Sequence, residues 1–310
     1  MIHTAIHNMK KSIQNNTSLV NYISTGFEKL DHKILGYQKG ELITIASRPN
    51  GEKTYFALAI VLNAIENNQK VYYILTGESS EQLISKIIAQ KHNINLKDFL
   101  LNNYDEKYKQ EIYETLDMIE KYLVIDEDLF FDINYLSHKI EYEYRYEYDL
   151  IVVDNYSYIT KQVDKNINRV CEFKRLAYVS KTPILLVTSF DIVSEKRFAK
   201  TPVATDIIDA RDIFTYSDKV LALYSDDIFK ERVEHIKELK SKQRYENPPY
   251  KSAFINKPAI EVQLHILKNN LGDLGQLKFN FHKAIVKFIF NDPLDFKDIS
   301  MIDIPDIPEM

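Results

Sequence analysis

The sequence contains one cysteine, 7 glycines and no tryptophan among its 310 residues, and shortages of this kind exclude several classes of protein. The lone Cys171 rules out an intramolecular disulfide and a cysteine-cluster metal site, so we expect a packed thiol in a helix. No apolar run approaches the ~18 residues that span a bilayer. The first residues also lack the basic-then-apolar pattern of a secretory signal. We therefore expect a cytoplasmic protein with no membrane partner.

Basic charge is also in short supply, since 40 Lys and Arg stand against 45 Asp and Glu, for a net charge of −5. The chain as a whole is therefore no electrostatic match for nucleic acid, although a local cluster of cations could still contact it. Aromatic side chains, by contrast, are abundant, with 21 Tyr and 16 Phe. With 45% hydrophobic residues, the chain can bury a sizeable core in one large α/β domain or two small ones.

From residue 41 onward, apolar stretches alternate with amphipathic ones, which is typical of an α/β fold with a mostly parallel central sheet flanked by helices. The apolar stretches predict strands at 41–46, 71–75, 122–125, 150–153, 184–188 and 219–224. The stretches between them predict helices near 53–67, 79–92, 105–121, 132–147 and 166–180. Two further strands, 260–268 and 276–290, are predicted to pair antiparallel through a Gly-containing turn.

The alternating pattern defines a domain over residues 21–290, with three segments of different character. Residues 1–20 hold a predicted short amphipathic helix at 4–15 and an Asn-rich linker. The charged residues 229–258 are interpreted as an insertion or an exposed hairpin within the domain. The acidic, Pro-containing residues 291–310 are interpreted as a tail. This tail either docks on a partner in extended form or is a solvated, disordered end.

One loop has the layout of a phosphate-binding site. A predicted strand runs into residues 47–54, SRPNGEKT, and then directly into a helix. Such a loop points backbone N–H groups and a helix N-terminus at phosphates, while its Lys contacts the phosphates and its hydroxyl residue contacts Mg²⁺. Lys53 and Thr54 fill these last two positions, but Ser47 and Glu52 stand where the pattern has glycine. The alternative is a surface turn that opens a helix.

Motifs around this loop are similar to those of known ATPases. STGFEKLD at 24–31, Leu35-Gly36 and Gly40-Glu41-Leu42 precede it as their counterparts do in RecA-type ATPases. Arg48-Pro49 and SSEQL at 79–83 resemble the DnaB-type replicative DNA helicases in particular, over most of the chain. The resemblance implies a RecA-like ATPase core that binds ATP and Mg²⁺, forms homo-oligomeric rings and acts on single-stranded DNA in replication. A KaiC- or RadA-like recombinase shares the fold but fits these motifs less well.

The resemblance assigns binding roles to residues of the loop and of a later strand. The residues that would hold the nucleotide are Arg48, Asn50, Gly51, Lys53 and Thr54. Thr54 and Asp154 would hold Mg²⁺, because Asp154 ends an apolar stretch as the metal-side aspartate of the family does. The alternative for Asp154 is a cap on the next turn. The helix at 4–15 would be a remnant of the linker helix by which ring subunits dock on their neighbours.

Several catalytic positions of the family are altered in this chain. Gly77 stands where the family has its catalytic glutamate, and Glu78 follows one residue late, on the other strand face unless a bulge turns it. The alternative role of Glu78 is that of a charge at a helix N-terminus. Lys268 matches the lysine that acts across the subunit interface, whereas Asn270 replaces the arginine finger and Phe190 a γ-phosphate-sensing glutamine. We therefore expect weak ATP binding and weak or absent hydrolysis.

Two segments match loops that face the DNA channel of helicase rings, and both are basic. The first segment supplies Lys161, Lys165 and Arg169, and the second supplies Lys196, Arg197 and Lys200. Clustered cations on such loops suit contact with the phosphates of single-stranded DNA. The alternative is a set of ordinary solvated surface cations.

Two classes of function stay open on the sequence alone. In the first, the chain is a helicase-like ATPase that single-stranded DNA stimulates. In the second, it is a degenerate, non-catalytic homologue that binds protein, either beside an active helicase subunit or in the replication of a mobile element. The altered catalytic positions favour the second class, and the retained Lys53, Thr54 and Asp154 favour the first.

Overall fold

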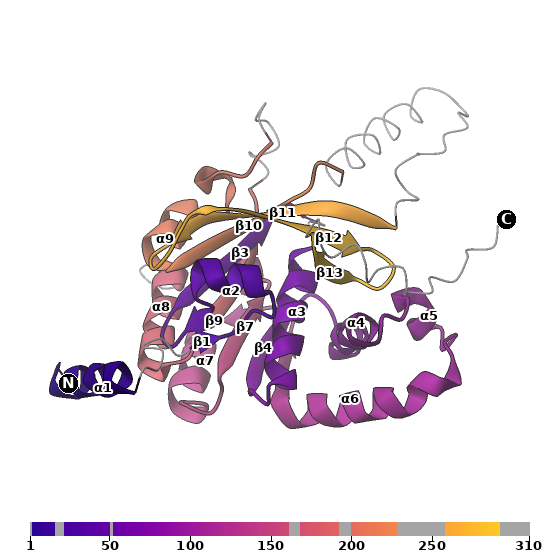
Figure 1. Cartoon of the computed structure of the whole chain (residues 1–310), viewed down its shortest axis with the longest axis horizontal. Helices are drawn as coiled ribbons and strands as arrows, with labels where there is room; N and C mark the ends of the chain where they lie inside the picture. Colours follow the sequence, from indigo (N-terminus) through magenta and orange to yellow (C-terminus); the bar gives the residue numbers. More distant parts are fainter. Residues whose placement is uncertain are drawn as a thin grey trace.

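The computed structural model describes residues 2–15, 22–49, 52–160, 168–191, 200–227 and 258–291. Within these residues, a nine-stranded sheet has the order β13-β12-β11-β10-β3-β9-β7-β4-β5 (Figure 1). Its strands are β3 (Leu42–Ser47), β4 (Val71–Thr76), β5 (Leu123–Asp128), β7 (Leu150–Asp154), β9 (Ile184–Ser189), β10 (Lys219–Tyr224), β11 (Ala259–Asn269), β12 (Gly275–His282) and β13 (Lys287–Phe290). The strands from β10 to β5 pair in parallel, which confirms the predicted α/β class.

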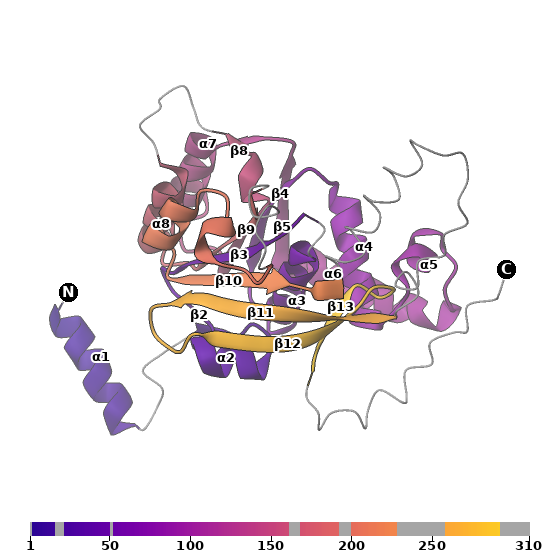
Figure 2. The same cartoon turned by 90° about the horizontal axis from the view of Figure 1, so that it is seen from above.

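Helices cover both faces of the sheet (Figure 2). On one face lie α2 (Glu28–Ile34), α3 (Lys53–Glu66), α4 (Ser80–His92) and α6 (Lys109–Tyr122). On the other lie α7 (Ile133–His138), α8 (Arg169–Ser180) and α9 (Ala210–Tyr216). Alternate strand residues supply the two cores, because successive side chains point to opposite faces. In β3, for example, Ile43 and Ile45 face α3, while Leu42 and Ala46 face α8.

Side-chain caps explain where two of the predicted helices begin. The Ser79 hydroxyl accepts a hydrogen bond from the backbone N–H of Gln82, and the Gln82 side chain accepts one in return, a capping box that starts α4. The Asn168 side chain accepts from the N–H groups of Val170 and Cys171 and starts α8. Cys171 is partly buried there, consistent with a packed thiol.

The predicted helix over 132–147 is wrong in its extent. Helix α7 ends at His138, and a π-helical turn, Lys139–Glu143, follows it. Tyr144 and Tyr148 then pack against Tyr72 of β4, with ring centres 5.0 and 5.4 Å away. The chain leaves the helix because both rings must reach the sheet within a few residues.

The single strand predicted over 276–290 is also wrong. A tight turn, in which Val286 has a φ of 48°, divides it into β12 and β13. The resulting hairpin brings Phe279 and Phe288 against Phe56 of α3, with ring centres 5.6 and 5.1 Å away. Burial of these rings stabilises the hairpin, whereas one long strand would carry Phe288 away from the core.

Short elements complete the described chain. β1 (Tyr22–Ile23) pairs with β2 (Tyr37–Gln38), β6 (Phe131–Asp132) pairs with β8 (Ile159–Thr160), and α5 (Leu96–Leu100) joins α4 to α6. Helix α1 (Ile2–Gln14) lies at one end of the molecule (Figure 1). Its Ile6, Met9 and Ile13 are exposed, and their spacing puts them on one side of the helix. The described helices are all too short or too polar to cross a membrane. Nearly all of the predicted tail and of the predicted insertion lie outside the described residues.

Candidate functional site

The carboxyl ends of β3, β7 and β4 meet the start of α3 at one edge of the sheet. Parallel strands end at the same edge, and ligands of open α/β sheets bind there. β7 ends at Asp154, which lies in register with Leu75 of the neighbouring β4. β3 ends at Ser47, and α3 begins at Lys53 after the loop. The topology thus places the predicted phosphate loop and the predicted metal-side aspartate at one edge.

Glu52 holds the backbone in the shape that a glycine adopts easily. Its φ is 62° and its ψ is 16°, which is the left-handed conformation. A residue with a Cβ is strained there by roughly 1–2 kcal/mol, whereas glycine is not. The loop therefore keeps a left-handed residue before Lys53 although the glycine is missing. Asn50 and Gly51, which were predicted to bind the nucleotide, lie outside the described residues.

Asp154 is the buried centre of the site, with 4% of its surface exposed. The hydroxyl of Tyr73 donates a hydrogen bond to Oδ2 of Asp154 at 2.8 Å, and the Thr54 side chain forms another with this carboxylate. Burial raises the pKa of Asp154, and the hydrogen bonds from Tyr73 and Thr54 and the charge of Lys53 oppose that rise. Burial likewise lowers the pKa of Lys53, and the charges of Asp154 and Glu52 oppose that change.

Tyr73 is a member of this site that the sequence reasoning missed. A tyrosine in an apolar strand is ordinarily a core residue, and its hydroxyl carries no motif. The signal that could have found it is register, because Tyr73 lies beside Val152 on the strand face that Asp154 shares. Alternation along two adjacent strands therefore places a tyrosine next to the aspartate.

Glu78 points toward α4, where it forms an ion pair with Lys86. The preceding residue, Gly77, has a φ of 84° just after β4 ends. Glu78 still lies near the site, since its charge contributes to raising the pKa of Asp154. Its charge also helps to raise the pKa of Tyr55 to about 12, after the larger effects of burial and of Glu52. The ion pair with Lys86 occupies the carboxylate of Glu78, and the catalytic role of Glu78 stays a prediction.

Arg48 makes its contacts behind the phosphate loop. Its guanidinium lies 5.6 Å from the ring centre of Phe190 and 5.4 Å from that of Tyr224, and Nη2 donates to the carbonyl of Lys200 at 3.0 Å. These contacts connect the loop to the end of β9 and of β10. The role of Arg48 in nucleotide binding stays a prediction.

Lys268 lies toward the end of the sheet at which the parallel strands begin. It pairs with Val220 of β10, which in turn pairs with Thr44 near the start of β3. Its ammonium donates to the carbonyl of Phe214 at 2.7 Å. Asn270 lies beyond it, and its side-chain amide donates to Asp218 at 3.2 Å. Lys268 is therefore remote from the phosphate loop of its own chain, and its predicted role concerns a neighbouring subunit.

The residues predicted to contact DNA are only partly described. Arg169 forms an ion pair with Asp209 at 2.7 Å, and its guanidinium lies 4.8 Å from the ring centre of Tyr156. Lys200 is half-buried and, as above, accepts the hydrogen bond from Arg48 through its carbonyl. Arg169 is thus engaged within its own chain. The others, Lys161, Lys165, Lys196 and Arg197, lie outside the described residues.

The described site fits a nucleotide phosphate and Mg²⁺ in its chemistry. Mg²⁺ takes oxygen ligands, and the hydroxyl of Thr54 and the carboxylate of Asp154 are neighbouring oxygen donors. Lys53 sits in the first turn of α3, where a helix N-terminus and an ammonium both favour an anion. The fold is of the RecA-like α/β class, and the phosphate-binding role of these residues stays a prediction.

Within this class, the chain belongs to the family described as the DnaB-like helicase C-terminal domain, which matches residues 22–290. The replicative DNA helicase DnaB of Helicobacter pylori is 24% identical over 291 residues, which cover 86% of this chain and 59% of that protein. The replicative DNA helicase DnaC of Bacillus subtilis is 25% identical over 294 residues, which cover 92% and 58%. The chain thus spans less than two thirds of the length of these relatives.

Solved structures show the same fold. The ATPase domain of G40P has a TM-score of 0.76 at 18% identity, covering 94% of this chain and 99% of that domain. A DnaB-like replicative helicase, studied with its interactions with primase, has a TM-score of 0.72 at 18% identity, covering 94% and 67%. The predicted resemblance and the predicted RecA-like fold are therefore both confirmed.

Proposed function

We propose that this chain is a nucleotide-binding module of the replicative-helicase type that holds ATP with Mg²⁺ weakly and hydrolyses it slowly at most. The observation that carries the proposal is the convergence of Lys53, Thr54 and Asp154 at the carboxyl edge of the sheet. These residues supply the cation and the oxygen donors that such a ligand requires. When bound, Mg²⁺ would neutralise phosphate charge, while Lys53 and the start of α3 would orient the phosphates.

Slow hydrolysis follows from the groups that surround this site. Gly77 has no side chain to orient a water molecule, and the nearby Glu78 is paired with Lys86. Phe190 is an apolar, buried ring at the end of β9. Asn270 cannot supply the bidentate cation of an arginine finger. In this chain, nucleotide binding and ATP hydrolysis therefore depend on different residues, and only the residues for binding are retained.

The proposed setting is DNA replication, with single-stranded DNA as a ligand and a ring or a second helicase subunit as a partner. Lys268 supports the proposal of an assembly, because it lies far from the phosphate loop of its own chain. A second candidate is a non-catalytic accessory that binds an active helicase. The glycine at position 77 and the asparagine at position 270 favour this candidate.

Nucleotide binding is tested by calorimetric titration of the full chain with ADP and Mg²⁺. We expect binding by the unaltered chain and a loss of about 100-fold in Lys53→Met. Two charges at 4 Å near a surface attract by roughly 4 kcal/mol, so such a loss is within the available energy. The control is Lys97→Met, an exposed lysine of α5 that should bind as the unaltered chain does. A chain that shows no binding at millimolar nucleotide contradicts the proposal.

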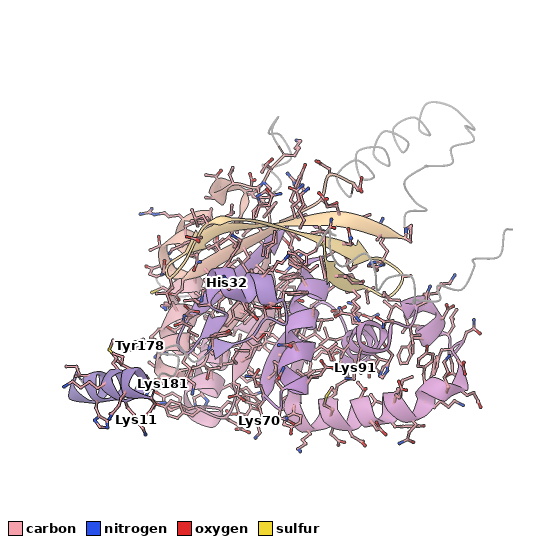
Figure 3. All side chains as sticks on the ribbon, viewed as in Figure 1. Lys11, His32, Lys70, Lys91, Tyr178 and Lys181 are labelled. Carbon is pink, nitrogen blue, oxygen red and sulfur yellow. The ribbon has the colours of Figure 1, made fainter. Side chains whose placement is uncertain are left out.

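Glu52→Gly is expected to improve nucleotide affinity by about tenfold or more, equivalent to 1.4 kcal/mol. The substitution removes a carboxylate beside the phosphates and relieves a left-handed backbone with a φ of 62°. The matched control is Lys181→Gly, which relieves a φ of 55° after α8, at the edge where the strands begin (Figure 3). Both variants should gain stability, but only Glu52→Gly should gain affinity in the same titration. Equal affinities would contradict a blocking role for Glu52.

A further inference from the structure

The hydrogen bond between Tyr73 and Asp154 joins two buried side chains at the proposed metal site. Tyr73 has no exposed surface, and Asp154 is 4% exposed. The donor and the acceptor, Oη and Oδ2, are 2.8 Å apart. A phenol is an ordinary neutral hydrogen-bond donor, and this one is fixed beside the carboxylate.

The geometry of the strands fixes this donor in place. Tyr73 on β4 lies beside Val152 of β7, and Asp154 follows on the same face of β7. The ring is fully buried in the core that α3 covers, where close packing restricts its movement. A donor of this kind holds one oxygen of the carboxylate and restricts its rotation. The rest of the carboxylate then serves Thr54, which also bonds to it.

The carboxylate also needs such a donor to stay charged. A buried carboxylate without partners is costly, and a hydrogen bond from a neutral donor offsets part of that cost. The Tyr73 hydroxyl supplies such a bond to Oδ2 of Asp154 at 2.8 Å. The bond therefore supports both the charge and the orientation that a metal ligand must have.

We propose that Tyr73 is a positioning residue for metal-dependent nucleotide binding, acting through Asp154. This inference rests on the nucleotide binding proposed above. Partners that orient a ligand of a metal ordinarily change metal affinity by about 10- to 100-fold when they are removed. The specific consequence is that Tyr73 contributes to binding of the nucleotide with Mg²⁺ and not to binding of the free nucleotide.

The test is Tyr73→Phe, which removes only the hydroxyl. The dissociation constant for ADP is measured by calorimetry twice, once with Mg²⁺ and once with EDTA. We expect it to rise about tenfold with Mg²⁺ and to stay within about twofold with EDTA. A merely structural role would change both values alike, and that result overturns the proposal, as does an unchanged value with Mg²⁺.

The adjacent strand residue offers a matched control. The Tyr72 hydroxyl donates to Asp126 at 2.7 Å on the opposite face of β4, away from the site. Tyr72→Phe should therefore lose a comparable hydrogen bond and leave both dissociation constants unchanged. A fall in metal-dependent affinity as large as that of Tyr73→Phe would show a general effect of the strand and overturn the proposal.

A double variant tests the route through Asp154. In an Asp154→Asn background the carboxylate is absent, so adding Tyr73→Phe should change the affinity with Mg²⁺ by less than about twofold, since interacting residues are not additive. A full additional tenfold loss in that background would overturn the route.

The proposed function fails separately, if the unaltered chain binds no ADP in either buffer. If it binds and Tyr73→Phe binds equally well, only the role of Tyr73 fails.

Discussion

Replacing Lys219 by methionine is expected to lower the free energy of unfolding by about 3–5 kcal/mol. Lys219 has no exposed surface, forms an ion pair with the buried Glu41, and donates to the carbonyl of Gly36 at 2.9 Å. Burial lowers the pKa of Lys219, while the charge of Glu41 opposes that change. Methionine would fill the space of the stem but leave a buried carboxylate without its cation, which costs more than the original pair.

The matched control for this prediction is Lys278→Met. Lys278 also lies on a strand and also pairs with a glutamate, Glu261, at 3.1 Å, but the two side chains are 51% and 40% exposed. Surface pairs of this kind contribute less than about 1 kcal/mol. Urea denaturation of the two variants should therefore separate them clearly. A loss below about 1 kcal/mol in Lys219→Met would show that water or a rearranged Glu41 relieves the buried charge.

Much of the fold could be predicted from the sequence because its signals are local. Alternation of apolar strands and amphipathic helices places β3, α3, β4 and α4 within a residue or so of their bounds. The phosphate loop and Asp154 could be predicted for the same reason, since each follows an apolar strand. Residues 276–290 misled the prediction because the hairpin depends on distant packing against Phe56.

The interactions that complete the site depend on contacts between distant parts of the chain. The bond from Tyr73 to Asp154 spans two strands, and the left-handed backbone of Glu52 contradicts its own local preference. The ion pair of Glu78 with Lys86 likewise depends on how α4 packs after β4. Such features are decided by tertiary structure, and no short motif marks them.

Turnover of ATP is expected to stay below about 0.01 s⁻¹, whereas ordinary enzymes reach about 1–10³ s⁻¹. Loss of an arginine finger alone costs about 10³–10⁵ in rate, and Asn270 stands at that position. Gly77 adds to the deficit, because no side chain at the end of β4 orients the attacking water. Lys53, Thr54 and Asp154 are proposed to act on binding, so we do not expect their presence to offset the loss in rate.

The central claim is that this chain binds a nucleotide but has lost efficient hydrolysis. It is tested most directly by phosphate release from ATP at a concentration that calorimetry shows to be saturating, with Mg²⁺ and with or without single-stranded DNA. We expect binding that Lys53→Met weakens by about 100-fold, together with turnover below about 0.01 s⁻¹ in both conditions. Turnover of about 1 s⁻¹ or more, in either condition, would contradict it and would mean that other residues replace the missing glutamate and arginine.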